Sequence, residues 1–132
     1  MAAGLPTEGD NAKKPRAGTV ARKDVPLCEL GERLGDVADR VAGIGWNAAV
    51  AVDEQRVVLG LLRAAELAKD PELSIEEAMR PGPSTFRPYV LIKEMADYMT
   101  QHKLDSSPIT TLDGKLVGLL FQEDAVREAG ES

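Results

Sequence analysis

The sequence predicts an α/β (α+β) protein made of two related units, each ordered strand-helix-strand-strand-helix. The stretches RVVLGLLRAAEL at 56–67 and KLVGLLFQEDAV at 115–126 both contain an apolar run, Gly-Leu-Leu and an acidic residue six positions after the glycine. A shift of 58 positions, from Gly60 to Gly118, keeps apolar character at matching places over about 45 residues, which indicates an internal duplication. Two such units can bury their strands against each other, so we expect a pseudo-twofold pair packed into one globule.

The first helix of each unit is predicted by apolar residues that recur on one helical face. In the first unit these are residues 30, 34, 37, 41 and 44, and in the second unit they are Ile92, Met95 and Met99. A shorter helix is expected after the strands of each unit, in AAELAK at 64–69 and QEDAVREA at 122–129.

Each unit also contains a predicted pair of strands. AAVAVDEQRVVLGLL at 48–62 and SPITTLDGKLVGLLF at 107–121 are each typical of two short strands around a polar turn. In the second unit Asp113-Gly114 is a strong hairpin signal, because glycine adopts the positive φ that tight turns need.

The remaining segments set the expected boundaries. We expect a flexible basic tail over 1–23, a first unit over 24–70, a connector over 71–83 and a second unit over 84–130. The tail is rich in Gly, Ala, Pro and Lys and has few large apolar groups to bury. In the connector, Ser74 and Glu77 match a capping box, so a short helix should begin at Ile75 and end before Pro81.

Composition excludes several classes of protein. The net charge of −6 argues against a protein that neutralises the phosphates of nucleic acids. Cys28 is the only cysteine, which fits a reducing compartment, and its alignment with Phe86 predicts a buried thiol. No apolar run approaches the ~20 residues that span a bilayer. We therefore expect a cytoplasmic protein without membrane insertion.

Catalytic and metal sites are not predicted. His102 is the only histidine and lies in a different unit from Cys28, so a nucleophile–base pair is not expected. It also has no His or Cys partner at the spacing of metal ligands. We expect neither an enzyme nor a metal protein.

An ordered set of residues in the second unit carries a family resemblance. The set comprises Met79, Pro81, Thr85, Pro108, Gly114, Gly118 and Asp124. It resembles the pattern of a CBS motif, named for the regulatory part of cystathionine β-synthase. The first unit resembles a more divergent copy, so the resemblance extends over roughly residues 24–130 and leaves out the tail.

The resemblance implies a tandem CBS pair, or Bateman module, that binds an adenosine-containing ligand in clefts between its motifs. AMP, ADP, ATP and S-adenosylmethionine are the ligands implied, and a homodimer that regulates an unidentified enzyme or transporter is the implied assembly. With no other domain in the sequence, the resemblance is to a stand-alone module acting in trans, or to a piece of a larger protein. The alternative is a ligand-free dimerisation or interaction module, whose clefts are filled by its own side chains such as Phe121 and Trp46.

The same resemblance implies ligand-binding residues in both units. In the second unit they are Thr85, Phe86, Arg87, Ser106, Ser107, Pro108, Ile109, Phe121 and Asp124. In the first unit they are Leu27, Cys28, Ala49, Val50, Arg63 and Glu66. Asp124 matches the ribose-binding position, because a carboxylate can accept hydrogen bonds from both ribose hydroxyls. Its other expected role is that of an acid in the first turn of a helix.

Two of these positions depart from the family pattern. The family often has Thr or Ser three residues after the glycine, where the hydroxyl helps to hold phosphate, but this chain has Arg63 and Phe121. Phe121 removes the hydroxyl, and the acidic Glu123 and Asp124 would repel a phosphate at the same helix start. Positive charge would then have to come from Arg63 or Arg87.

Overall fold

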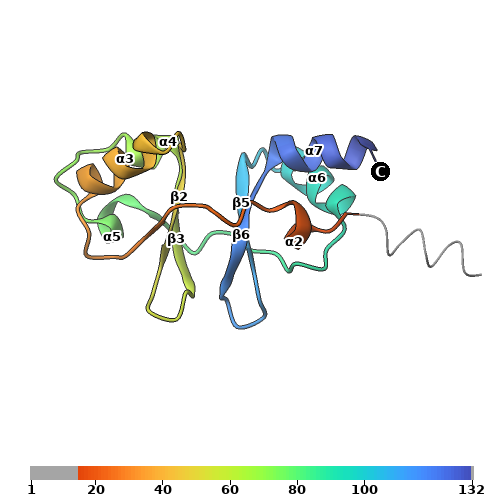
Figure 1. Cartoon of the computed structure of the whole chain (residues 1–132), viewed down its shortest axis with the longest axis horizontal. Coiled ribbons are helices and arrows are strands. Elements are labelled where there is room, and N and C mark those ends of the chain that lie inside the picture. The colour runs from red at the N-terminus through yellow and green to blue at the C-terminus, as the bar shows by residue number, and fades with distance from the viewer. Residues whose placement is uncertain (1–14, 132) are drawn as a thin grey trace, which may run out of the picture.

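In the computed structural model, which describes residues 15–131, two units lie side by side with their strands at the centre and their helices outside (Figure 1). The buried residues Val25, Val50, Leu61, Leu116 and Leu119 form a core cluster between the two strand pairs. Because these residues come from both units, neither sheet can bury its inner face without the other. The predicted pseudo-twofold pair in one globule is confirmed.

The first unit is built on a sheet with the strand order β1-β2-β3-β4. Strands β1 (Leu27–Cys28) and β2 (Ala49–Val52) are parallel, whereas β3 (Val58–Leu62) runs antiparallel to both β2 and β4 (Arg80–Pro81). Helix α3 (Leu34–Gly43) precedes β2, and the short helix α4 (Ala64–Leu67) follows β3. Alternate residues of β2 face the inner core and the helix-side core, as a strand buried on both faces requires.

The second unit repeats this order with a sheet of two strands in place of four. Helix α6 (Ile92–Gln101) precedes the antiparallel hairpin of β5 (Ser106–Thr110) and β6 (Leu116–Phe121), and α7 (Gln122–Glu131) follows. Gly114 has a φ of +87° in the turn before β6, as the Asp-Gly signal predicts. The expected first strand of this unit differs from the structure, because it is reduced to one parallel bridge between Phe86 and Ile109.

The segment before each unit packs against the other unit. Helix α5 (Ile75–Ala78) begins after Ser74, whose Oγ accepts a hydrogen bond from the Glu77 backbone N–H at 3.2 Å, and packs on the core of the first unit. Helix α2 (Ala17–Val20) packs in the same way on α6 and α7 of the second unit. The 58-position shift relates the two helices, so the duplication extends beyond the predicted units.

The structure corrects the expected flexible tail at residues 15–23. Ala17 and Ala21 are buried in the core of the second unit, and Arg22 pairs with Leu119 of β6. Small alanine side chains allow this segment to approach α6 closely, so it is buried without large apolar groups. Residues 1–14 of the expected tail lie outside the described residues.

The repeated Gly-Leu-Leu has a glycine because another segment of the backbone lies too close to leave room for a Cβ atom. A Cβ atom at Gly118 would lie 2.9 Å from the backbone oxygen of Arg22 and 3.1 Å from the Cβ of Ala21. A Cβ atom at the equivalent Gly60 would meet the side chain of Met79 and lie 3.0 Å from the backbone oxygen of Arg80. In both units the glycine therefore lets the segment before the repeat lie directly against the sheet.

Candidate functional site

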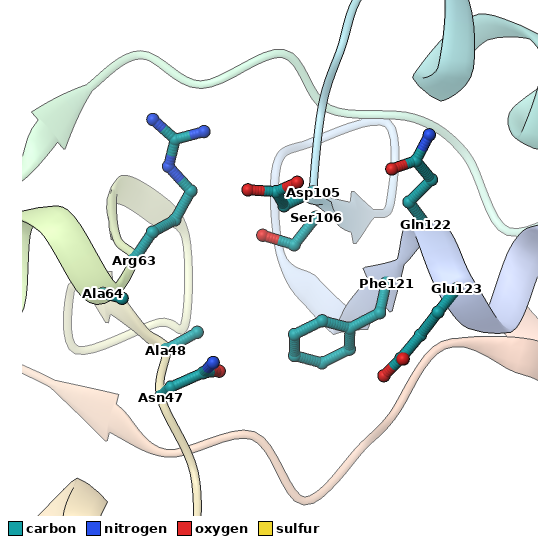
Figure 2. Close-up of a pocket in the computed structure, with 9 residues that line it drawn as sticks. All are labelled: Asn47, Ala48, Arg63, Ala64, Asp105, Ser106, Phe121, Gln122 and Glu123. Atoms are coloured by element: carbon teal, nitrogen blue, oxygen red, sulfur yellow. The ribbon is translucent and has the colours of Figure 1, made fainter.

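A cavity of about 270 Å³ lies between the two units, where β3 and β6 run into the helices that follow them (Figure 2). We call it the axial cavity, and it is lined by Asn47, Ala48, Arg63, Ala64, Asp105, Ser106, Phe121, Gln122 and Glu123. The 58-position shift pairs most of these residues with one another, for example Arg63 with Phe121 and Ala48 with Ser106. The axial cavity is therefore a place where equivalent positions of the two repeats face each other.

The two halves of the axial cavity differ in chemistry although they are equivalent in position. Figure 2 shows the guanidinium of Arg63 on one side and the ring of Phe121 on the other, with Asp105 and Ser106 pointing inward between them. Asn47 and Ala64 stand where the second unit has Asp105 and Gln122. One arginine, two carboxylates and several neutral polar groups thus surround one aromatic ring, so the cavity can hold a polar molecule with an apolar face.

Arg63 lies at the start of α4 and is held there by Glu66. The Arg63 backbone N–H donates to Glu66 Oε1 at 2.8 Å, and Arg63 Nε lies 3.5 Å from the same oxygen. The side chain of Arg63 is 24% exposed, and its buried Nε has no hydrogen-bond partner among the described residues. Glu66 is buried and serves as a helix cap, which directs its carboxylate to the backbone of its own unit.

Asp124 is the centre of a second cluster, which it forms with Arg22 and Arg127. Arg22 Nε donates to Asp124 Oδ2 at 2.8 Å, Arg22 Nη2 donates to Asp124 Oδ1 at 3.2 Å, and Arg127 Nη2 donates to the same Oδ1 at 3.0 Å. The side chain of Asp124 is only 5% exposed. The hydrogen bond from Arg22 holds the pKa of the Asp124 carboxyl below its usual value, against the opposing effect of burial.

The guanidinium of Arg22 also contacts the aromatic residues of the cleft. Its Cζ lies 4.6 Å from the ring centroid of Phe121 and 5.9 Å from that of Trp46, and the two rings are 5.9 Å apart. A cation at this distance from an aromatic face is attracted by the ring quadrupole. Phe121 stands where the family often has Thr or Ser. Here it stabilises the guanidinium of Arg22 through a cation–π contact.

Two further cavities meet at Arg22. One of about 470 Å³ contains Asp124, with Thr19, Val20 and Arg127 also in its wall, and the other of about 420 Å³ contains Trp46, Asn47, Phe121 and Glu123. Arg22 lines both of them. The second also shares Asn47, Phe121 and Glu123 with the axial cavity. The side chain of Arg22 thus stands between Asp124 and the space that leads to the axial cavity.

The structure brings together only some of the residues expected to bind ligand. Arg63, Ser106 and Phe121 line the axial cavity, whereas Asp124 lies in the neighbouring cavity behind Arg22. The other expected residues do not line the axial cavity and are Leu27, Cys28, Ala49, Val50, Glu66, Thr85, Phe86, Arg87, Ser107, Pro108 and Ile109.

Several of these residues are engaged within their own unit. Arg87 donates from Nη2 to Thr85 Oγ1 and from Nη1 to Thr110 Oγ1, each at 2.6 Å. Ser107 Oγ donates to the backbone oxygen of Ser84 at 2.9 Å. These hydrogen bonds fasten the segment before α6 to strand β5, so the described contacts of Arg87 and Ser107 are structural.

Cys28 is buried, as its alignment with Phe86 predicts. It is 2% exposed and belongs to the core cluster of the first unit. Burial raises the pKa of its thiol to about 12, with a smaller contribution from the charge of Glu32.

Sequence reasoning missed Arg22, Asn47 and Asp105. Asn47 and Asp105 lie beside residues of the family pattern, whereas Gln122 and Glu123 lie within its segment from Gly118 to Asp124. The 58-position shift pairs Asn47 with Asp105, so either residue points to the other, but no local pattern marks Arg22 as the partner of Asp124.

Within residues 15–131, no group of His, Cys, Asp and Glu side chains is placed to hold a metal ion. None of the helices in that part of the chain has the length and apolar character that a membrane span requires.

Comparison with known proteins places the fold. The crystal structure of CBSX2 in complex with AMP superposes with a TM-score of 0.78 at 18% identity, covering 89% of this chain and 97% of CBSX2. The CBS domain pair of MJ0100 in complex with 5′-methylthioadenosine and S-adenosyl-L-methionine gives 0.78 at 19% identity, covering 89% and 98% of the two chains. The cytosolic domain of the Mg²⁺ channel MgtE in complex with ATP gives 0.76 at 22% identity, covering 89% and 50%.

At the level of sequence, no curated protein matches this chain. The CBS domain family matches residues 75–131, which include α5 and the whole of the second unit. The first unit repeats the same elements on the other side of the pseudo-twofold axis, and the pair superposes on solved CBS pairs over most of its length. Residues 75–131 therefore match the CBS domain family, and the two units together have the fold of a CBS domain pair.

Proposed function

We propose that this protein is a regulatory module that binds an adenosine-containing ligand in the axial cavity and signals its occupancy to a partner protein. The observation that carries the proposal is the position of the cavity, which is built by equivalent residues of both CBS motifs. A ligand there would touch both units at once, so its binding can change how they pack together. CBS pairs of the same fold have been solved with AMP, ATP and S-adenosylmethionine, which supports this class of ligand.

The lining of the axial cavity suits a nucleoside. The ring of Phe121 offers an apolar face for a base, and Asn47, Ser106 and Gln122 offer neutral donors and acceptors for its edge. The carboxylates of Asp105 and Glu123 can accept hydrogen bonds from sugar hydroxyls. Arg63 can pair with a phosphate or a carboxylate of the ligand. A homodimer, a cytoplasmic location and a regulated enzyme or transporter are parts of the same proposal.

The experiment is a thermal-shift screen with AMP, ADP, ATP and S-adenosylmethionine. A ligand that binds only the folded state raises the midpoint of unfolding by mass action. Trp46 is the only tryptophan and lies beside Phe121, so its fluorescence reports on the same cleft. The absence of any shift or fluorescence change with all four compounds would contradict the proposal.

A matched pair of variants tests the place of binding. Ala64 is exposed and lines the axial cavity, whereas the neighbouring Ala65 is exposed and does not. The Ala64→Phe substitution should fill the cavity and remove the thermal shift, and Ala65→Phe should leave the shift unchanged. Equal shifts in both variants would move the binding site elsewhere.

One observation favours the alternative of an interaction module with self-filled clefts. Arg22, Phe121 and Trp46 already occupy part of the space between the motifs. Under this alternative the protein assembles with a second copy or a partner and does not respond to nucleotides. The thermal shift with AMP separates the two functions, because only the first predicts a response to the ligand, and sedimentation then measures the assembly.

A further inference from the structure

We infer that the side chain of Arg22 blocks the ribose-binding side of the second motif, at Asp124, and limits the protein to one adenosine ligand per chain. The inference rests on the proposed function for the nature of the ligand. It goes beyond it by assigning the specificity of the cleft to a residue that stands outside the family pattern. Both family carboxylate positions, Glu66 and Asp124, are satisfied by arginines or backbone of this chain, but only at Asp124 is the partner a distant side chain.

The first step is the geometry of the carboxylate. Both oxygens of Asp124 accept hydrogen bonds from Arg22, at 2.8 Å and 3.2 Å, and Oδ1 accepts a further one from Arg127. A ribose would need these same two oxygens for its two hydroxyls. Asp124 is 5% exposed and both of its oxygens are occupied, so a sugar could hydrogen-bond to them only by displacing Arg22.

The second step is the support of the guanidinium. The backbone of Arg22 is fixed by two hydrogen bonds to Leu119, one from the Arg22 N–H at 2.9 Å and one from the Leu119 N–H at 3.0 Å. Its guanidinium lies over the ring of Phe121 and within 3.5 Å of Glu123 Oε1. Arg22 is thus held by the strand, the aromatic ring and two carboxylates together.

The third step is that the first motif does not repeat this arrangement. The pseudo-twofold mates of Arg22 and Asp124 are Arg80 and Glu66, and no ion pair joins them within residues 15–131. Glu66 instead accepts the backbone N–H of Arg63, and Arg80 is exposed. The residue at the position of Phe121 is the cation Arg63, which repels a second arginine where the aromatic ring attracts one.

The last step concerns the cavities. Arg22 is a wall both of the cavity that contains Asp124 and of the cavity that contains Phe121 and Trp46. Removal of the guanidinium would join these two spaces and leave the Asp124 carboxylate open to the joined cavity. A nucleoside could then place its ribose at Asp124 and its remaining groups beside Phe121.

The test is isothermal titration of the full chain with AMP, in wild type and in the Arg22→Gln variant. The wild type should bind no more than one AMP per chain. Arg22→Gln should gain a second site, and the double variant Arg22→Gln/Asp124→Asn should lose that second site again. Arg127→Gln is the matched control, because Arg22 still holds both oxygens of Asp124 there, and it should keep the wild-type stoichiometry.

Several outcomes would overturn the inference. These are two AMP molecules bound to the wild type, a second site that survives in the double variant, or an Arg22→Gln variant that binds no more AMP than the wild type. If Arg22→Gln does not fold, Arg22→Met keeps the apolar stem of the side chain without the guanidinium and should show the same gain.

The outcome also separates this inference from the proposed function. A wild type that binds no AMP, with a gain in Arg22→Gln that depends on Asp124, would contradict binding in the axial cavity. The same result would support the block of Asp124 by Arg22. A wild type that binds one AMP, with no gain in Arg22→Gln, would support the proposed function and contradict the block of Asp124 by Arg22.

Discussion

The ion pair between Arg22 Nε and Asp124 Oδ2, 2.8 Å apart, joins residues that are 102 positions apart in the sequence. It fastens the segment before the first motif to the last helix of the second motif. The segment before the second motif packs on the first in the same way, through α5 and β4. The two units are thus held together by exchanged segments as well as by the core between their sheets.

The first prediction concerns the pH dependence of this ion pair. Asp124→Asn should lower the free energy of unfolding at pH 7 by about 1–2 kcal/mol, a value reduced because Arg22 is 42% exposed. Arg22 keeps the folded-state pKa of Asp124 below the unfolded value of about 3.9. The unfolded chain therefore binds the proton first, so the contribution is complete above that value and is lost as the pH falls through the folded-state pKa.

Urea unfolding of wild type and Asp124→Asn at pH 7, 5, 4 and 3 measures this effect. The stability difference between the two should stay constant down to about pH 5 and shrink toward pH 3. Asp97→Asn breaks the exposed pair with Lys93 and serves as the control, with a change of less than about 0.5 kcal/mol at every pH. A difference that grows toward pH 3 would contradict the lowered pKa of Asp124 in the folded state.

The repeat and its periodicities were sufficient to predict the architecture. The stripe of Leu34, Val37 and Val41 is buried on α3, and the two strand pairs occur where the apolar runs predict them. These signals are local, because helical and strand periods are set within a few residues. The stripe ends earlier than expected, since Ile44 lies beyond the end of α3 and is exposed.

Helix α2 and the ion pair between Arg22 and Asp124 were not predicted, because both depend on contacts between residues far apart in the sequence. Residues 15–23 lack large apolar groups, so composition suggested a solvated tail, whereas Ala17 and Ala21 are buried against residues far along the chain. The partner of Asp124 is likewise distant in sequence, and a pairing of two side chains leaves no periodic pattern. Extending the 58-position shift to α5 would have predicted α2, because a true duplication repeats its connectors as well.

The second prediction tests the close approach at the Gly-Leu-Leu of the second unit. In Gly118→Ala the new Cβ would lie 2.9 Å from the Arg22 backbone oxygen, so β6 and residues 21–22 must move apart. We expect a loss of about 1–3 kcal/mol in the free energy of unfolding, measured by urea titration.

Gly43→Ala provides the matched control at the end of α3. A Cβ there meets no atom within 4 Å, so the higher helix propensity of alanine should leave stability unchanged or raise it by up to about 1 kcal/mol. Equal effects of the two substitutions would contradict the assigned role of Gly118.

The third prediction concerns the reactivity of Cys28. Because burial raises the pKa of this thiol to about 12, native protein at pH 8 should react with Ellman's reagent only through unfolding. Relative to protein in 8 M urea, the rate should be lower by on the order of a thousandfold or more. The contribution of the neutral thiol to stability is complete below the unfolded pKa of about 8.5 and is lost as the pH rises toward 12. Fast labelling of native protein would place the thiol at the surface.

The fourth prediction is that Arg63 binds the phosphate of AMP in the axial cavity. Arg63 supplies the positive group of this cavity, and Figure 2 shows its guanidinium at the edge of the cavity, where a phosphate can pair with it. Replacement by methionine keeps the apolar stem of the side chain and removes the guanidinium. Arg63→Met should weaken AMP binding about tenfold, as expected for one hydrogen bond to a charged group, and should change adenosine binding less than about twofold.

Titration calorimetry at 50 mM and 500 mM salt checks this assignment. The affinity of wild type for AMP should fall at the higher salt, because the ions screen the pair between Arg63 and the phosphate, and that of Arg63→Met should change little. Lys93→Met is the control, since it removes an exposed cation from the outer surface of α6, outside the axial cavity. An equal loss of adenosine and AMP binding in Arg63→Met would show that Arg63 shapes the cavity through its contact with Glu66 and does not meet the phosphate.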